Sequence, residues 1–250
     1  MPDTIAATSE RLDPLLQSEG ASEYDRATMA LHLERYRLAA EYVAGRHVVD
    51  CACGTGYGSH MMADAGAQTV QGVDRDAATV EYARTHHAVD GVRYVAGDAM
   101  SFSAEPAADV WVSLETIEHL PDPRGYIRHV ASQLAPGARL IASVPVTVST
   151  DGNPHHLWDF TARSFRALLV NSGFRVEREL RQLHRFTLSD ITGDARGARQ
   201  KDRRGNLIAW YAAHPVAFAR RVWLTLTRGF VHEYLTIVAV RVGPVAGGRE

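Results

Sequence analysis

The stretch 48-VVDCACGTGYG-58 decides how this chain folds. It joins a short β-branched apolar run, residues 47–52, to a segment with helical spacing of apolar residues from about Tyr57 to Ala65. Glycines in such a turn permit positive φ angles and let the backbone approach a ligand closely. In an open α/β sheet this turn lies at the carboxyl ends of the strands, where ligands bind. The stretch therefore predicts a buried strand, a ligand-binding turn and a helix.

The alternation of strand and helix continues on both sides of the turn. Apolar residues at a spacing near 3.6 predict a helix from Asp25 to about Val43. Beyond the turn, strands are predicted at 69–73, 92–96, 109–113, 139–144, 174–180 and 234–242, and helices at 77–86, 125–134 and 161–171. Repeated strand–helix units predict a mostly parallel sheet with helices on both faces and right-handed connections.

The 250 residues are predicted to form a single domain with one elaboration. Residues 1–45 would form an N-terminal arm and helix, with the first 23 residues closing over a ligand, and residues 46–183 the core. An insertion, residues 184–231, separates the last two strands, and residues 232–243 form the last strand. The insertion begins as a polar loop rich in arginine and glycine and continues as an apolar, partly helical segment.

The composition excludes several classes of protein. Hydrophobic residues make up 46% and charged residues 22%, as in globular proteins, and no run of about 18 apolar residues predicts a membrane span. A net charge of −2 gives no chain-wide attraction to nucleic acid. The two cysteines, Cys51 and Cys53, cannot form a disulfide framework, and no secretory leader begins the chain, so we expect a cytoplasmic protein.

Carboxylates follow the two strands after the glycine turn. Asp74, followed by Arg75, ends one strand, and Gly97-Asp98-Ala99-Met100 follows the next. Asp74 is placed to accept both hydroxyls of a ribose, and Asp98 an adenine amino group, with Ala99 or Met100 beside the ring. The turn alone would also suit a tight strand–helix junction, but the three elements together predict a nucleoside site.

Asp50 indicates which nucleoside this site would take. The glycine spacing is Gly54-x-Gly56-x-Gly58 rather than the dinucleotide pattern G-x-G-x-x-G, and Asp50 precedes Gly54 by four residues. A carboxylate there would repel a pyrophosphate but suits an ammonium group. S-adenosylmethionine carries an adenosine, a sulfonium and an amino-acid tail, whose carboxylate can bind the N–H groups at the start of the helix.

The chain resembles class I S-adenosylmethionine-dependent methyltransferases from about Leu31 to Phe174. VDCACGTGYG is similar to their first motif, VQGVD to the second, GDAM to the third and DVWVSLETIEHL to the fourth. HLERYRLAAEYV and GNPHHLWDFT resemble a branch that acts on sugars, glycans and secondary metabolites, including antibiotic biosynthesis. The resemblance implies a Rossmann-like seven-stranded sheet in the order 3-2-1-4-5-7-6, with the seventh strand antiparallel and an insertion before it.

The resemblance also implies that Glu115 faces the cofactor. We therefore expect S-adenosylmethionine, and S-adenosylhomocysteine as product, to be bound by residues of the turn and of the next three strand ends: Asp50, Ala52, Gly54, Thr55, Gly56, Asp74, Arg75, Gly97, Asp98, Ala99, Met100 and Glu115. Cys51 and Cys53 lie on the predicted buried strand, where small thiols pack well, so we assign them no metal or redox role.

Histidines after the fourth and fifth strands are the catalytic candidates. A hydroxyl acceptor needs a base, and His155 or His156 is predicted to supply it, with His119 as a second acid–base group. Alternatively, one of the pair caps the following helix or stacks against Trp158, and His119 makes a structural contact. Asp151, Asn153 and the two adjacent histidines would offer metal ligands, but neighbouring residues rarely point at one ion, so we expect no metal.

The acceptor is expected to be a small molecule. A sugar-like or glycosylated natural product methylated on oxygen is the first choice, and an amine is the second, because Glu115 and Glu118 suit a cation. Arginines of the insertion would bind the phosphate of a nucleotide-linked sugar, or form a solvated loop; its aromatic residues would line the acceptor pocket, form a homodimer contact or pack as an extra helix.

Nucleic-acid substrates are disfavoured. Methylases that act on flipped bases usually carry an N/D-P-P-Y string after the fourth strand, which this chain lacks. Ribose methylases with a Lys-Asp-Lys-Glu tetrad need two lysines, and Lys201 is the single lysine of this chain. Two other classes stay open. A nicotinamide-dependent oxidoreductase is opposed by Asp50 and by the glycine spacing, and a cofactor-binding protein without catalysis would lack polar groups beside the sulfonium.

Overall fold

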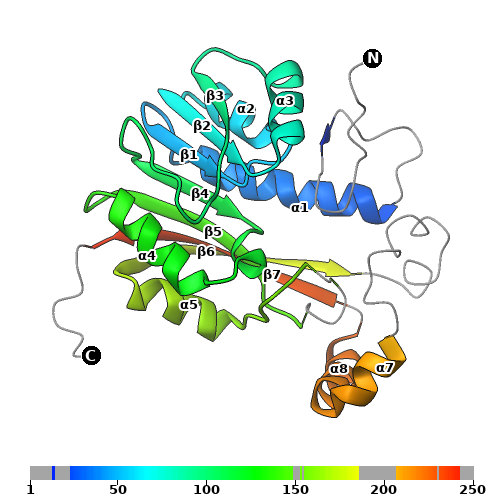
Figure 1. Ribbon diagram of the computed structural model, residues 1–250. Coiled ribbons are helices and arrows are strands. Elements are labelled where there is room, and N and C mark those ends of the chain that lie inside the picture. The colour runs from blue at the N-terminus through cyan, green and yellow to red at the C-terminus, as the bar shows by residue number, and fades with distance from the viewer. Residues whose placement is uncertain are drawn as a thin grey trace.

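The computed structural model describes residues 13–14, 23–148, 153, 155–185, 207–229 and 231–242. Most of the predicted N-terminal arm, and the arginine-rich loop up to residue 206, lie outside the described residues. The strands form one seven-stranded sheet in the order β3-β2-β1-β4-β5-β7-β6, which is the order that the resemblance implies (Figure 1). Their bounds are β1 His47–Cys51, β2 Thr69–Asp74, β3 Val92–Ala96, β4 Val110–Leu114, β5 Arg139–Pro145, β6 Phe174–Arg185 and β7 Val231–Arg241.

The sheet is parallel except at one strand. Strands β1 to β5 pair in parallel, whereas β7 pairs antiparallel with both β5 and β6. The carboxyl ends of β1 to β5 therefore meet at one edge of the sheet, where ligands bind in open α/β folds.

Helices cover both faces of the sheet (Figure 1). They are α1 Glu23–Ala40, α2 Tyr57–Asp64, α3 Ala77–His86, the 3₁₀ helix η2 Ile117–His119, α4 Pro123–Gln133, α5 Ala162–Asn171, α7 Leu207–Ala213 and α8 Pro215–Arg228. Side-chain caps begin several of them: Asp76 accepts from Ala78 N before α3, and Thr161 and Ser164 form a reciprocal capping box at α5.

Alternating strand residues build the two larger of three hydrophobic clusters in the described residues. On β1, Val48 packs in one core with α1 and α2, and Val49 packs in the other with α4 and α5. On β4, Val110 and Val112 face α1 and α2, whereas Trp111 faces α4. This period of two, with both sets buried, explains why the strands read as continuous apolar runs.

The insertion differs from the prediction mainly at its edges. Strand β6 continues to Arg185 rather than ending near residue 180, and β7 begins at Val231. Within the insertion α7 and α8 form, and α8 is held to the segment that follows β5 because Arg221 donates to the carbonyl of Val148 at 2.9 Å. Arg220 of α8 also lies 3.8 Å from Asp159.

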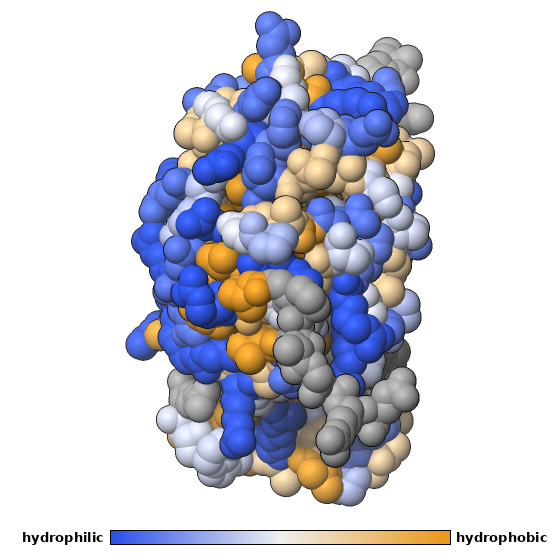
Figure 2. Space-filling view, turned by 90° about the vertical axis from the view of Figure 1, so that its left-hand side faces the viewer, coloured by the Kyte–Doolittle hydropathy of each residue, from blue (hydrophilic) through white to orange (hydrophobic). Residues whose placement is uncertain are grey.

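The side of the molecule opposite the carboxyl ends of the parallel strands is where β5 begins and β7 ends. This side is mostly hydrophilic, with hydrophobic residues gathered in a small central area (Figure 2). None of the described helices is long and apolar enough to cross a membrane.

Candidate active site

The turn between β1 and α2 adopts left-handed backbone conformations at three alternate residues. The φ angles are 62° at Ala52, 56° at Gly54 and 93° at Gly56. A Cβ atom added to Gly54 would meet no atom within 4 Å, so this glycine exposes its backbone to open space. Gly54 is therefore the position at which a ligand can approach the turn closely, whereas Ala52 holds a conformation that costs an L-residue about 1–2 kcal/mol.

The other two glycines of the turn serve packing. A Cβ on Gly56 would lie 2.7 Å from Ala83 Cβ and 2.8 Å from the Tyr94 ring, and a Cβ on Gly58 would lie 2.0 Å from the Tyr36 ring. Gly56 also precedes α2 as its N-terminal cap residue, and Thr55 beside it is buried. The pattern read from the sequence as one ligand-binding device thus combines one open position with two close helix contacts.

Asp74 joins the end of β2 to the glycine turn. Its Oδ2 accepts from Gly54 N at 3.1 Å, and its Oδ1 accepts from Asp76 N at 3.0 Å. Each oxygen keeps lone-pair capacity, and the half-buried carboxylate borders the open side of Gly54. Asp74 therefore fits a ribose with two hydroxyls; the neighbouring Arg75 is exposed.

The loop after β3 presents the residues predicted for adenine. Asp98 is exposed, and its Oδ1 accepts from Met100 N at 2.9 Å, which fixes the side chain in a tight turn. Gly97 N donates to the carbonyl of Asp74 at 2.9 Å, so this loop lies directly beside the ribose-binding candidate. Ala99 and Met100 are half-buried and pack against the core, with an exposed part left for a ring.

Asp50 lies deeper than the sequence suggested. It is buried between β1 and the two helices α1 and α2, where Ser59 Oγ donates to Oδ2 at 2.7 Å and the Tyr36 hydroxyl donates to Oδ1 at 3.3 Å. Burial raises the pKa of Asp50 to about 7, although the hydrogen bonds from Ser59 and Tyr36 act in the opposite direction. A cationic group brought to this end of β1 would favour the ionised form.

Glu115, directly after β4, is held in place by residues that the sequence did not single out. Its φ angle is 50°, Ser143 Oγ donates to its Oε1 at 2.7 Å, and its own N–H donates to Ser143 Oγ at 3.0 Å. Arg35 of α1, 1% exposed, lies 3.5 Å from the same carboxylate oxygen. The guanidinium offsets the charge of Glu115, so this carboxylate offers less attraction to a cation than the sequence implied.

Arg35 is held in position by residues of β6 and β7, the two strands at one edge of the sheet. Its Nε donates to Gln182 Oε1 of β6 at 2.7 Å, and its guanidinium lies 4.4 Å from the centre of the Tyr234 ring on β7. These partners are far from Arg35 in the sequence, which is why no local pattern revealed them. The one available signal was a charged residue on the apolar face of the predicted first helix.

Histidines and a carboxylate from two loops converge beyond β4 and β5. Possible ligand atoms of Glu118, His119 and His156 all lie within 4.8 Å of one another, and the His119 and His156 rings meet edge to face with centres 4.7 Å apart. Burial, followed by the positive charge that His119, His232 and His155 can carry, lowers the pKa of His156 to about 3. The His156 imidazole is therefore neutral near pH 7.

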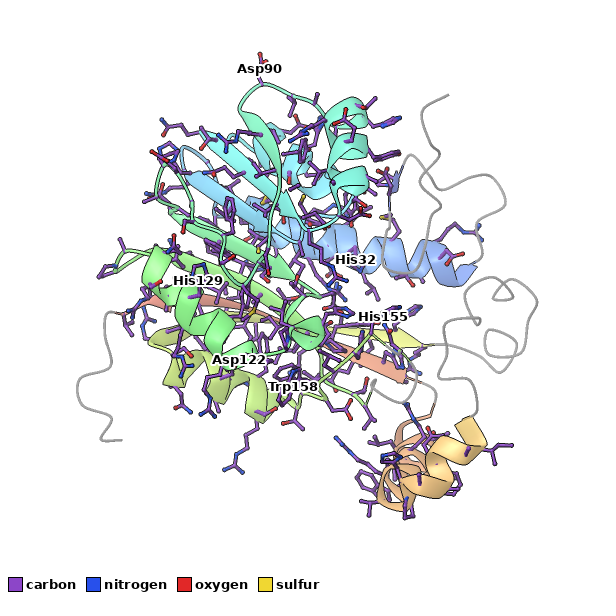
Figure 3. The ribbon with its side chains drawn as sticks, viewed as in Figure 1. His32, Asp90, Asp122, His129, His155 and Trp158 are labelled. Atoms are coloured by element: carbon purple, nitrogen blue, oxygen red, sulfur yellow. The ribbon has the colours of Figure 1, made fainter. Side chains whose placement is uncertain are left out.

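Hydrogen bonds hold these two loops together. The His119 Nδ1 is 3.1 Å from the carbonyl of His155, Leu157 N donates to the carbonyl of Glu118 at 2.8 Å, and Trp158 Nε1 donates to the carbonyl of Leu120 at 2.9 Å. His155 itself is exposed, and Figure 3 shows it and Trp158 at the same end of the sheet.

The helix-capping alternative for the histidine pair does not apply, since Thr161 caps α5. Asp151, one of the metal ligands considered from the sequence, lies outside the described residues.

The two cysteines are free and buried among the residues of β1 and the turn. Burial raises the pKa of Cys51 to about 12, so its thiol stays protonated.

The fold and this strand-end site define a Rossmann-like protein that binds an adenosyl cofactor. A model of the methyltransferase domain matches residues 49–142. A "probable S-adenosylmethionine-dependent methyltransferase" of Mycolicibacterium smegmatis is 32% identical over 203 residues, covering 78% of this chain and 75% of the relative. The chain belongs to the S-adenosylmethionine-dependent methyltransferases, and S-adenosylmethionine is its cofactor.

Two further comparisons concern parts of the chain or the fold alone. A ubiquinone biosynthesis O-methyltransferase of Stutzerimonas stutzeri is 38% identical over 105 residues, which are 40% of this chain and 45% of that protein. The N-methyltransferase NodS of Bradyrhizobium japonicum, solved with S-adenosyl-L-homocysteine, has a TM-score of 0.58 at 14% identity and covers 88% of this chain and 89% of its own. The described residues fit the cofactor, since Gly54 opens to free space beside the Asp74 carboxylate.

Proposed function

We propose that the protein methylates an oxygen of a small hydroxylated molecule, with a sugar-like or glycosylated natural product as the first choice. The observation that carries the proposal is the grouping of imidazoles, from His119, His155 and His156, at the strand end beyond Glu115. A hydroxyl needs a base to receive its proton, and imidazole is well suited near neutral pH. Figure 3 shows His155 at this end of the molecule, away from Asp90, which lies in the loop between α3 and β3.

When bound, S-adenosylmethionine supplies a methyl group whose carbon forms a bond to the acceptor oxygen while its bond to sulfur breaks, with the electron pair going to sulfur and the acceptor proton to the base. The chain's residues hold the reactants in line and exclude water. We assign the base to His155 or His156, with His155 as the first choice because the lowered pKa of His156 makes it a weak proton acceptor, and a supporting acid–base role to His119. Arg75 and Thr55 are assigned to the cofactor with the residues described above.

An amine acceptor is the second candidate. It is favoured by the two carboxylates after β4, Glu115 and Glu118, but Arg35 offsets the charge on Glu115. The ubiquinone-pathway relative is named as an O-methyltransferase, which supports oxygen as the acceptor atom.

We also infer a role for α8, whose Trp223 is 60% exposed: it lines the acceptor side or contacts a second copy of the chain. We further infer that the protein works in the cytoplasm, where free buried cysteines stay reduced.

The test is a screen of hydroxylated and aminated acceptors with S-adenosylmethionine, in which mass spectrometry looks for the mass gain of one methyl group. We expect a hydroxylated acceptor to gain it, and His155→Ala or His156→Ala to lower turnover without changing the affinity for S-adenosylhomocysteine. Methylation of amines alone would replace the first choice with the second. Full activity in both single variants would refute the assigned base.

A further inference from the structure

Glu118, His119 and His156 converge in a way that is typical of metal ligands and that the proposed methyl transfer does not require. A carboxylate and two imidazoles from separate loops bring possible ligand atoms within 4.8 Å of one another. Ligand atoms at about 2.1 Å from a tetrahedral ion lie about 3.4 Å apart, so small side-chain rotations would place all three around one ion. Glu118 is completely buried, a position in which a nearby cation stabilises a carboxylate.

Both imidazoles have a nitrogen free for coordination. His119 Nδ1 bonds the carbonyl of His155 at 3.1 Å, and its Nε2 keeps a lone pair for which the described part of the chain shows no hydrogen bond. Metal-binding histidines commonly donate their second nitrogen to a carbonyl in this way, because the bond fixes the ring and its tautomer. His156 Nδ1 is buried and has no hydrogen-bond partner among the residues that the structure describes.

The loops that carry the ligands are fixed before any ion arrives. The contacts from Leu157 to Glu118 and from Trp158 to Leu120 hold the segment after β5 against η2. The expectation of no metal was based on a different set, with Asp151, Asn153 and the two adjacent histidines. In the structure His156 instead pairs with two residues of η2, so the objection to adjacent histidines no longer applies.

We propose that Glu118, His119 and His156 form a site for one divalent first-row transition-metal ion, such as Zn²⁺. Two imidazoles and one carboxylate suit such ions, whereas Mg²⁺ and Ca²⁺ prefer oxygen ligands. Three protein ligands leave a coordination position open. An acceptor hydroxyl bound there would lose its proton more easily, a role that rests on the proposed O-methylation, and His155 would then be the base.

The test uses the full chain, treated with a chelator and titrated with Co²⁺, whose visible absorption reports its ligands. We expect one Co²⁺ per chain, with bands typical of four or five ligands, and at least about 10-fold weaker binding in His119→Ala, His156→Ala and Glu118→Gln. His86→Ala, on the exposed part of α3, is the matched control and keeps full Co²⁺ affinity. Circular dichroism and S-adenosylhomocysteine binding establish that each variant is folded.

Two results would overturn the site: no Co²⁺ absorption in the unaltered chain, or Co²⁺ affinity unchanged in folded His119→Ala and Glu118→Gln. If His156→Ala does not fold, those two variants decide alone. Because the readout is metal binding, the site and the proposed O-methylation can fail separately. A chain that methylates hydroxyls without binding Co²⁺ would keep the function and lose the metal site.

Discussion

Replacing Asp74 by alanine should weaken cofactor binding because it removes both the proposed contact to the ribose hydroxyls and the hydrogen bonds that support the glycine turn. The carboxylate accepts from Gly54 N at 3.1 Å and from Asp76 N at 3.0 Å, and it is the group assigned to the ribose hydroxyls. Hydrogen bonds to a charged group contribute about 1.5–3 kcal/mol each, and less where water can replace them. We therefore expect Asp74→Ala to weaken S-adenosylhomocysteine binding by about 1–3 kcal/mol, or about 5- to 150-fold.

Isothermal titration calorimetry measures this affinity directly, and two variants frame the result. Asp74→Asn keeps one carbonyl oxygen and should lose less affinity than Asp74→Ala. Asp90→Ala changes an exposed carboxylate in the loop between α3 and β3, far from the site, and should leave the affinity unchanged (Figure 3).

An analogue that lacks the ribose hydroxyls separates direct contact from disturbance of the turn. If Asp74 binds those hydroxyls, the difference between the unaltered chain and Asp74→Ala should shrink for the analogue, as in a double-mutant cycle. Equal affinity of folded Asp74→Ala and the unaltered chain for S-adenosylhomocysteine would refute the assignment. An undiminished difference for the analogue would limit Asp74 to supporting the turn.

Three further predictions concern the elements around the turn. Ala52→Gly removes the strain of a φ of 62° and should raise the free energy of unfolding by about 0.5–1 kcal/mol in urea denaturation, whereas Ala78→Gly, in the helix α3, should lower it. A lower free energy of unfolding in Ala52→Gly would contradict backbone strain at this residue. Gly56→Ala combines a φ of 93° with a Cβ 2.7 Å from Ala83 Cβ, so the same assay should show a loss of about 3 kcal/mol, and an unchanged midpoint would exclude the clash. Asp50 has a pKa near 7 in the folded chain against 3.8 in the unfolded chain, so the free energy of unfolding should fall as pH rises through that range. Between pH 5 and 8 the free energy of unfolding of Asp50→Asn should rise by about 2–3 kcal/mol relative to that of the unaltered chain, and a difference that stays constant with pH would refute the raised pKa.

The fold could be predicted because the central strands β1, β2, β4 and β5 are short, apolar and almost entirely buried. Strand order followed from the resemblance, and the sheet confirms it. The end of β6 was missed for a physical reason: as an edge strand it alternates exposed residues with buried polar ones, Gln182 and His184, and so resembles a loop in sequence.

The strand-end residues of the site could be expected from topology, but their partners could not. Asp74 and Asp98 follow neighbouring strands, so parallel pairing places them together. Arg35 reaches Glu115 and Gln182 only after α1 has packed across β4 and β6, a contact that no local pattern encodes. Likewise, His119 and His156 were separate candidates in the sequence, and only the folded loops bring them to one point with Glu118.

The most direct test of the account is a crystal structure of the protein with S-adenosylhomocysteine. We expect the ribose hydroxyls on Asp74, the adenine beside Asp98 and Met100, and the amino-acid tail over Gly54, with its sulfur directed toward Glu118 and the histidines. A cofactor bound away from Gly54 and Asp74, or no binding at concentrations that saturate related enzymes, would contradict the central claim.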